Sequence, residues 1–416
     1  MASAQLPKYT PTDRLYLWLL TQPARPTFIG ELNLVRAAQS VSLRYAESWL
    51  RSGFPLSEDM PLIDQELIPA DKGVAMGAVD DARPDRWGER VIRFIGKPPR
   101  LSLLEFLYFA GDDRFGALGV STSAEEYLPR RLGPLPTLSD ADRIHELVGR
   151  VLANEPVPQA QKRLISPGAT MGGARPKALV DVGGDQWVIK FADGEPIDTP
   201  LVEHATMTLA ATARIRVAVT RPIRLTHGHA VAIQRFDRHR GQRFHALSAA
   251  VALRAAGERF GYPELAQLIR RRGVIARDRH IGQMRELFRR MVFNILIDNT
   301  DDHEKNHALL VTDANQYELS PAYDVLPTGQ ALGYQQMRVG ESEADSTLDN
   351  ARSMARLFSL EPDAALREVR AVAKVVDGWK EHFRRSGVTA SDVKLLAEQI
   401  DRPFLLEQRK DVRRRT

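Results

Sequence analysis

The chain has 416 residues, enough for two or three domains with a large buried core. Apolar residues make up 43% of it and charged residues 27%, values that exclude global disorder and a fibrous architecture. The 58 basic and 53 acidic side chains leave a formal charge of +5, too small for this length to indicate nucleic-acid binding. Because cysteine is absent, disulfides, thiolate zinc sites and cysteine nucleophiles are excluded, and any metal must bind to oxygen or imidazole ligands.

The sequence predicts neither a membrane segment nor an export signal. It has no apolar run of about eighteen residues, the length needed to cross a bilayer. Residues 1–8 lack the basic start and the apolar core of a secretory signal. We therefore expect a cytoplasmic protein that makes no membrane contact. Basic residues gather at 270–272, 289–290 and 409–415, where they either neutralise the phosphates of a partner or form solvated surface.

The first region, residues 1–128, mixes short apolar runs with glycine and proline, which is typical of a compact α+β unit. Residues 129–137 follow with three prolines and show neither a helical nor a strand period, as expected of a linker. We assign residues 129–158 to this linker and a connecting helix.

Residues 159–240 are predicted to form β-strands with one helix. The runs 177–182 and 186–191 favour strands, and the short Gly-Gly-Asp loop between them indicates a β-hairpin. Apolar residues recur at helical spacing over 201–215. Residues 230–236 then return to a strand pattern.

A glycine-rich stretch precedes the predicted hairpin, and a lysine ends its second strand. Glycines in 168–173 let backbone N–H groups approach phosphate oxygens, and Arg175 and Lys177 add positive charge. Lys190 is placed to pair with phosphates and with Glu203 of the next helix, as the strand lysine of kinases does. The alternatives are a plain loop, since the Walker spacing is absent, and a lysine that faces solvent.

Residues 241–416 are predicted to be mainly helical. Apolar residues spaced by three and four over 281–295 indicate an amphipathic helix that leads into the polar stretch 299–306. There Asp301 precedes Asn306 by five residues, the spacing at which a kinase catalytic loop carries its proton acceptor and a magnesium ligand. Asp324 can supply a further metal-binding carboxylate. The alternative is a polar loop whose side chains cap turns.

These parts occur in the order that a two-lobed kinase requires. We therefore predict an α+β chain with a protein-kinase-like fold, in which a β-rich N-lobe over 159–240 and a helical C-lobe over 241–416 follow an α+β N-terminal subdomain. The five-residue spacing to Asn306 selects Asp301 over Asp302 as the proton acceptor.

The chain also resembles the HipA-like serine/threonine kinases, the toxin half of bacterial HipBA toxin-antitoxin systems. The resemblance covers nearly the whole chain. Its most specific motifs are GGARPK (172–177), QRFD (234–237), NTDDHEKN (299–306) and PAYD (321–324). In the first region, residues 49–56, 84–88 and 111–118 are similar to the family's N-terminal subdomain.

The resemblance implies a role for each matched residue. Asp301 corresponds to the proton acceptor, while Asn306 and Asp324 correspond to the Mg²⁺ ligands. The hinge holds adenine through backbone groups, so Gln234 in place of the expected glutamate should be tolerated. The residues that the resemblance places at ATP are Gly172, Gly173, Ala174, Arg175, Pro176, Lys177, Lys190, Gln234, Arg235, Phe236, His303, Glu304, Lys305, Asn306, Tyr323 and Asp324.

The resemblance also implies self-inhibition. In the family, a serine of the glycine-rich loop is autophosphorylated, which ejects the loop and blocks ATP binding; this chain has Thr170 there. Threonine keeps the hydroxyl, but its extra methyl restricts the rotamer, so the modification is expected at Thr170 or, shifted, at Ser166.

The implied activity is ATP-dependent phosphorylation of protein serine or threonine. The family's known targets include aminoacyl-tRNA synthetases, so a translation-related substrate is expected. A small DNA-binding antitoxin is the expected partner, and DNA would be reached only through it, because no helix-turn-helix is evident. Two alternatives remain: a nucleotide-binding pseudokinase that serves as antitoxin partner and co-repressor, and a small-molecule kinase.

Overall fold

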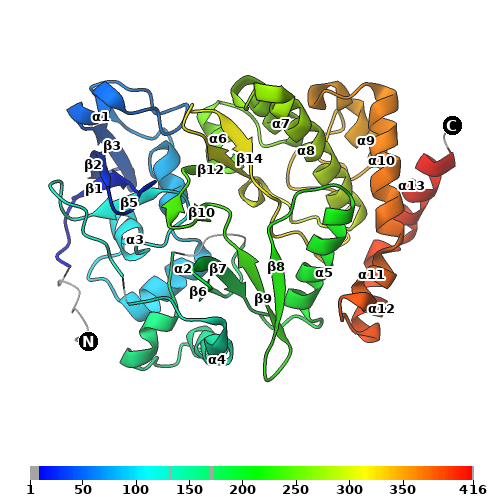
Figure 1. Ribbon diagram of the computed structural model, residues 1–416, viewed down its shortest axis with the longest axis horizontal. Coiled ribbons are helices and arrows are strands. Elements are labelled where there is room, and N and C mark those ends of the chain that lie inside the picture. The colour runs from blue at the N-terminus through cyan, green and yellow to red at the C-terminus, as the bar shows by residue number, and fades with distance from the viewer. Residues whose placement is uncertain (1–8, 132, 169–172, 415–416) are drawn as a thin grey trace. The chain divides into compact units, whose positions relative to one another are not determined.

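The computed structural model describes residues 9–131, 133–168 and 173–414, which fall into two compact units (Figure 1). Unit 1 comprises the chain as far as Asp193 together with residues 232–247. Unit 2 comprises residues 194–231 and the chain from Ser248 onward. These limits differ from the expected borders at 128, 158 and 240, because the β-hairpin belongs to unit 1 while the helix that follows it belongs to unit 2.

Unit 1 contains an antiparallel five-stranded sheet with the strand order β4-β3-β2-β1-β5. The strands are β1 (Arg14–Leu19), β2 (Thr27–Val35), β3 (Ser40–Tyr45), β4 (Glu66–Leu67) and β5 (Leu118–Ser121). Leu15 and Leu17 of β1 are fully buried, and α3 (Leu103–Phe109) packs on the sheet (Figure 1). Gly30 of β2 is needed because an added Cβ would lie 2.2 Å from the backbone oxygen of Arg44 on β3.

The rest of unit 1 is made of short helices, the β10–β11 strand pair and strands of a second sheet, in which β6, β7 and β9 are neighbours in that order. β6 and β7 form the predicted hairpin, and their ends agree with the predicted runs to within one residue. The elements are α1 (Glu47–Ser52), η1 (Gly77–Ala82), α2 (Arg86–Val91), η2 (Ile92–Gly96), η3 (Leu138–Asp140), α4 (Ala141–Leu152), η4 (Gln159–Leu164), β6 (Lys177–Val182), β7 (Asp185–Lys190), β10 (Arg238–His239) and β11 (Gln242–Arg243). Two elements cross the unit limits, β9 (His229–Gln234) and β12 (Ala246–Ser248).

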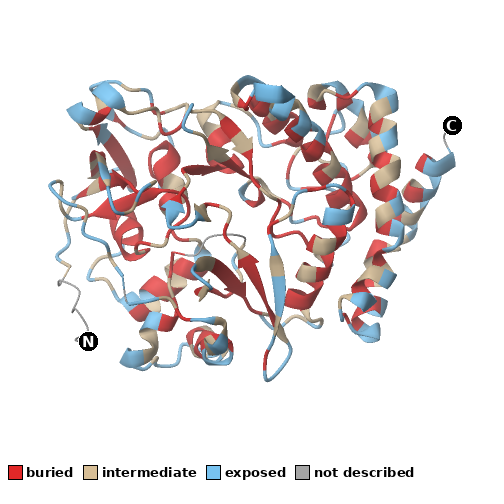
Figure 2. Cartoon of the chain, viewed as in Figure 1, coloured by how far each residue is buried: buried red, intermediate tan, exposed pale blue. Residues whose placement is uncertain are grey.

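Unit 2 is mainly helical, as predicted. α8 (Arg279–Leu296) extends the predicted helix at both ends and buries Met284, Phe288 and Met291 completely. α7 and α10 pack on it, each with a buried and an exposed side (Figure 2). Burying one side chain of this size stabilises the folded state by roughly 1.5–3 kcal/mol. With three such side chains fully buried, α8 lies in the core of the unit.

The remaining elements of unit 2 surround α8 or precede it in the chain. They are α5 (Thr199–Thr212), β8 (Thr220–Arg224), α6 (Ala249–Ala255), α7 (Tyr262–Arg272), η5 (Ala276–Asp278), η6 (Glu304–Asn306), β13 (Ala308–Val311), β14 (Tyr317–Leu319), α9 (Leu348–Ser353), η7 (Ala355–Phe358), α10 (Pro362–Asp377), α11 (Trp379–Arg385), α12 (Ala390–Ile400) and α13 (Pro403–Arg414). Within the described ranges, no helix is long and apolar enough to span a bilayer.

Candidate active site

The loop after α8 begins with a buried aspartate that fixes the direction of the chain. Asp298 adopts a left-handed backbone conformation, with φ of 61°, and is 1% exposed. Its Oδ1 accepts a hydrogen bond from Nη1 of Arg402 at 2.7 Å, and its backbone oxygen accepts one from the N–H of Thr328 at 3.1 Å. Non-glycine residues rarely adopt this conformation, so the surrounding contacts must hold the turn in place.

The two adjacent aspartates of this loop have opposite environments. Asp301 is exposed, whereas Asp302 is 1% exposed. Asp302 accepts hydrogen bonds from the hydroxyl of Tyr262 and from Nε2 of His307, the latter at 2.8 Å. Burial alone would raise the pKa of Asp302, but the charge and hydrogen bonds of His307 and the Tyr262 hydroxyl hold it below its ordinary value. Asp302 therefore anchors the loop, whereas Asp301 is exposed to solvent.

Asn306 lies at the end of η6 with an unsatisfied oxygen. It is 4% exposed, and its Nδ2 donates to the backbone oxygen of Asp301 at 3.4 Å. In the part of the chain that the structure describes, its buried Oδ1 has no hydrogen-bond partner. A buried carbonyl oxygen without a partner costs free energy, unless a ligand such as a cation satisfies it.

Asp324 follows in a second segment that a tyrosine ties to the catalytic loop. The hydroxyl of Tyr323 donates to the backbone oxygen of Lys305 at 2.7 Å, and Tyr323 lines a small cavity together with Asn306. Asp324 is 8% exposed and has a left-handed φ of 58°. An amide oxygen and a carboxylate are ligands that Mg²⁺ accepts, with substrate phosphates and water completing its shell, so these residues fit that metal.

The other residues of the loop that the sequence places at ATP lie in the same segment. His303 and Glu304 are half-buried, and Lys305 is exposed. Nδ1 of His303 is a further buried atom without a hydrogen-bond partner among the described residues. The loop thus combines an exposed carboxylate with inward polar atoms.

In unit 1, the β6–β7 hairpin carries two lysines directly opposite each other. Lys177 pairs with Lys190 in the antiparallel register, so both side chains lie on one face of the hairpin, and they are 0% and 1% exposed. The ammonium of Lys177 is hydrogen-bonded to the carboxylate of Asp85 and to the backbone oxygen of Gly173. The carboxylate of Asp85 supplies one anion to this face, and phosphate groups would be a further source of negative charge beside the two lysines.

Part of the predicted glycine-rich loop can be located. Ala174 is exposed, Arg175 is half-buried, and the backbone oxygen of Pro176 accepts from the N–H of Phe191 at 3.0 Å. Ser166 is half-buried. Thr170 and Gly172 lie outside the described residues.

The predicted hinge, residues 234–236, begins at the last residue of β9. Its backbone is held by the N–H of Arg235, which donates to the backbone oxygen of Gln186 at 3.1 Å. The side chain of Gln234 donates to Asp185 at 3.1 Å, and the ring centroid of Phe236 lies 6.2 Å from that of Phe115.

The side chain of Arg235 faces the N-terminal region of unit 1. Its guanidinium is bound to the carboxylate of Asp237 and to the backbone oxygens of Asp113 and Arg114, and the residue is 3% exposed. Only its backbone is therefore left for a nucleotide.

The predicted site residues thus form two groups. Unit 2 brings together Asp301, residues 303–306, Tyr323 and Asp324, whereas unit 1 carries residues 173–177, Lys190 and residues 234–236. Sequence reasoning missed the anchors Tyr262 and His307, because no local pattern predicts which distant side chains meet Asp302. It also missed the role of Asp85, although the motif 84–88 that contains it was noticed.

Comparisons with known proteins cover both parts of the chain. The profile of the HipA-like C-terminal domain matches residues 169–379, and the profile of the HipA N-terminal domain matches residues 24–121. The chain is 30% identical over 193 residues to Y4dM of Sinorhizobium fredii, a protein whose name describes it as a kinase. This match spans 42% of this chain and only 44% of Y4dM. It is 23% identical over 340 residues to the serine/threonine-protein kinase toxin HipA of Shewanella oneidensis, covering 74% of this chain and 75% of that one.

A solved structure has the same fold. HipA of Shewanella oneidensis, in a complex with HipB and its operator DNA, superposes with a TM-score of 0.65 at 18% sequence identity. The superposition covers 95% of this chain and 97% of that one. The expected mixed architecture, with antiparallel sheets and a helical C-terminal part, is confirmed by this likeness.

Proposed function

Since this chain belongs to the HipA-like family, we propose that it is an ATP-dependent serine/threonine protein kinase and the toxin of a bacterial toxin-antitoxin system. The observation that carries the proposal is the contrast within the loop 299–306. Asp302 is buried and hydrogen-bonded, Asp301 is exposed, and the buried Oδ1 of Asn306 has no hydrogen-bond partner among the residues that the structure describes. A loop that only capped turns would have no reason to leave that oxygen unsatisfied.

In the proposed reaction, Asp301 orients the substrate hydroxyl and accepts its proton as the hydroxyl oxygen bonds to the γ-phosphorus of ATP. The bond from that phosphorus to the bridging oxygen breaks, and ADP leaves. Lys190 neutralises charge on the phosphates, and Asn306 and Asp324 would hold the metal. Bound Mg²⁺ supplies further neutralisation of phosphate charge.

We propose a substrate and a partner for this chain from its family resemblance and from the solved relative. The protein substrate is a translation-related protein such as an aminoacyl-tRNA synthetase, because that is what the family resemblance implies. The solved relative is complexed with HipB and operator DNA, which supports a small DNA-binding antitoxin as the partner of this chain. Autophosphorylation of the glycine-rich loop would limit the activity.

Transfer of labelled phosphate from ATP tests the kinase proposal. We expect Asp301→Asn to lower the rate by about 10² to 10⁴, the usual contribution of a positioned base, and Asp324→Asn to abolish transfer. Asp313→Asn is the matched control, because Asp313 is an exposed aspartate in the loop between β13 and β14 of the same unit. Undiminished transfer by Asp301→Asn and Asp324→Asn would refute the proposal, and ATP binding without transfer by the natural chain would favour the pseudokinase.

A further inference from the structure

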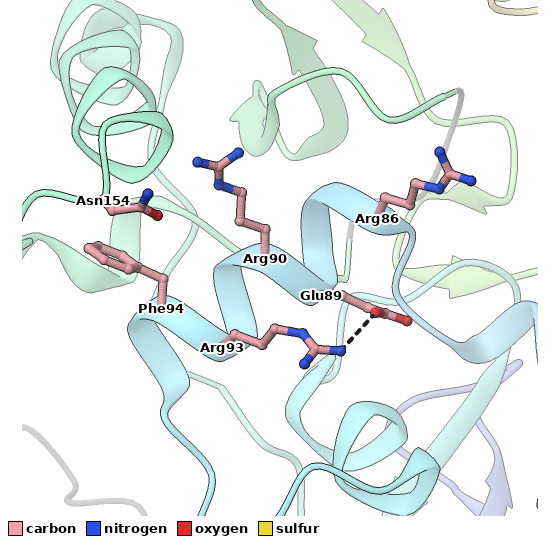
Figure 3. A pocket seen from close by; sticks show the side chains of 6 residues that line it. All are labelled: Arg86, Glu89, Arg90, Arg93, Phe94 and Asn154. Carbon is pink, nitrogen blue, oxygen red and sulfur yellow. Dashed lines mark hydrogen bonds and ion pairs between the residues drawn. The ribbon is translucent and has the colours of Figure 1, made fainter. Parts of the chain in front are cut away.

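A pocket of about 350 Å³ lies in unit 1, beside α2, the π-helical turn η2 and the end of α4 (Figure 3). It is lined by Arg86, Glu89, Arg90, Arg93, Phe94 and Asn154. None of these residues belongs to the candidate active site. The volume falls in the range of roughly 300–1,000 Å³ that is typical of small-molecule pockets.

The lining carries more positive than negative charge. Three of its side chains are arginines and one is a glutamate, and that glutamate is shared, lying 3.5 Å from Arg93 and 3.7 Å from Arg83. Nη2 of Arg90 donates to the backbone oxygen of Leu152 at 2.6 Å, a partner without a formal charge. Arg86 is exposed and makes no hydrogen bond or ion pair within the described ranges.

The position of these arginines is unfavourable for the helix itself. Arg86 begins α2, where a cation opposes the helix dipole, and Arg90 lies one turn later on the same face, where like charges repel. The carboxylate that precedes them, Asp85, already caps α2 through the N–H of Gly88 and pairs with Lys177. The repulsion between these two charges is unfavourable for α2, although Arg90 also donates to the backbone oxygen of Leu152, and an anionic ligand beside Arg90 would reduce that repulsion.

The other wall of the pocket offers an aromatic ring and an amide. Phe94 lies in η2, half-buried, and π-helical turns within α-helices are frequent at functional sites. Figure 3 shows Arg90, Phe94 and Asn154 near one another at one end of the pocket, whereas Arg93 turns to Glu89 and Arg86 lies at the other end.

We propose that this pocket binds a phosphorylated small molecule of about nucleotide size. The phosphate would sit against Arg90, at the end of the pocket that also holds Phe94 and Asn154, since a guanidinium group matches phosphate oxygens with paired hydrogen bonds. A planar group of the ligand would lie on Phe94, and Asn154 would bind its polar edge. This site is separate from the proposed transfer reaction and stands whether or not the chain transfers phosphate.

Phenyl phosphate is a suitable probe because it joins a phosphate to an aromatic ring. Its binding to the full chain, and to Lys190→Ala in which any active-site phosphate position is weakened, is measured by calorimetry and ³¹P NMR without added nucleotide, because a nucleotide would compete for the proposed pocket. We expect saturable 1:1 binding that Arg90→Gln weakens about tenfold, the worth of one charge-assisted hydrogen bond.

Two further variants separate binding from folding. Arg86→Gln changes an exposed arginine at the other end of the pocket, so this variant should bind phenyl phosphate as tightly as the natural chain does. Phe94→Ala should lower the affinity for phenyl phosphate to that for inorganic phosphate. Arg150→Gln is the control, because Arg150 lies on α4 outside the pocket and pairs with Glu146 at 3.1 Å.

The proposal is overturned if the natural chain shows no saturable binding at millimolar phenyl phosphate, or if Arg90→Gln binds as well as the natural chain. Equal loss in Arg150→Gln would show a general charge effect and would also overturn it. Benzoate binding as tightly as phenyl phosphate would overturn the assignment to phosphate.

Discussion

At the scale of single residues, identical side chains next to each other in the chain acquire different tasks from their surroundings. Asp302 is held by Tyr262 of α7 and by His307, while Asp301 faces outward. The five-residue spacing to Asn306 predicts that Asp301 is the proton acceptor, and the exposure of Asp301 is compatible with that prediction. The burial of Asp302 was not predictable, because Tyr262 lies forty residues away and reaches the loop only through the packing of α7 on α8.

The anchoring role of Asp302 predicts a stability difference between the two positions. Asp302→Ala leaves the buried hydroxyl of Tyr262 and the ring of His307 without an acceptor, so we expect a loss of about 3 kcal/mol in the free energy of unfolding. Asp301→Ala removes an exposed side chain and should change it by less than about 0.5 kcal/mol. Urea denaturation followed by circular dichroism measures both. Equal losses in the two variants would show that Asp302 is not an anchor.

The glycine-rich loop carries a residue-scale prediction about regulation. If the chain inhibits itself, mass spectrometry of the purified protein should find phosphate on Thr170, or on Ser166, and none on the variant Asp301→Ala. A phosphate adds about two negative charges near Arg175 and Lys177, enough to re-order such a loop. Phosphate on neither residue in an active preparation would exclude this form of self-limitation.

At the scale of elements, regular structure followed local patterns well. The hairpin β6–β7, α5 and α8 all lie where spacing and turn residues predicted them, because each pattern repeats over many residues. The exact ends depend on single contacts that periodicity does not report. α5 begins at Thr199, for example, because the side chain of Asp198 caps it by accepting from the N–H of Leu201 at 3.3 Å.

The segment after β9 is an element whose purpose the sequence did not reveal. The family resemblance placed Arg235 at the nucleotide, but its guanidinium is engaged by Asp237 and by the segment 111–116. The carboxylate of Asp237 also accepts from Arg238 at 3.0 Å and from the N–H of Gly116 at 2.8 Å. The hinge is thereby fastened to the N-terminal region of unit 1.

The ion pairs of Asp237 make the free energy of unfolding depend on pH. Burial would raise the pKa of Asp237, but the charges of Arg235 and Arg238 hold it well below its ordinary value. In the unfolded chain the pKa returns to about 3.9. Because the pKa of Asp237 is lower in the folded state, its carboxylate contributes its full stabilisation above the unfolded-state pKa. This stabilisation is lost as the pH falls from the unfolded-state pKa through the folded-state pKa.

We therefore expect the free energy of unfolding to decline below about pH 4, and to decline less steeply in Asp237→Asn, which has no such group to titrate. Asp313→Asn serves as control, since that carboxylate is exposed. Urea titrations at a series of pH values provide the comparison. Parallel pH profiles for the natural chain and Asp237→Asn would contradict the argument.

At the scale of the whole molecule, the proline-rich stretch predicts domain borders at residues 128 and 158, but both positions lie inside unit 1. The linker at 129–137 contains no helix or strand among its described residues, as expected, yet segments on both sides of it pack together. Nε1 of Trp87 donates to the backbone oxygen of Lys177 at 2.7 Å, and a Cβ on Gly88 would lie 2.2 Å from the backbone oxygen of Pro167. Such contacts join residues that no local pattern connects.

A chain shortened to residues 159–416 should therefore not fold as an independent kinase domain. It lacks Asp85, which would leave the buried ammonium of Lys177 without its carboxylate, and it lacks the segment that binds Arg235. We expect loss of cooperative thermal unfolding by circular dichroism. Proteolytic cleavage between Glu125 and Glu126 is the control, because it cuts an exposed turn but keeps both pieces. Cooperative unfolding of the shortened chain near the Tm of the full chain would contradict the prediction.

The division of the chain between the units has a consequence for biosynthesis. Unit 1 includes residues 232–247, so it stays incomplete when the first 193 residues have left the ribosome. Arg235 and Asp237, which fasten the hinge, are made only after α5 and β8 of the other unit. The emerging chain must therefore hold the lysine-bearing hairpin in an unfinished state until residue 247 has been translated. A product terminated before residue 235 would therefore lack the contacts that Arg235 and Asp237 make with residues 113–116.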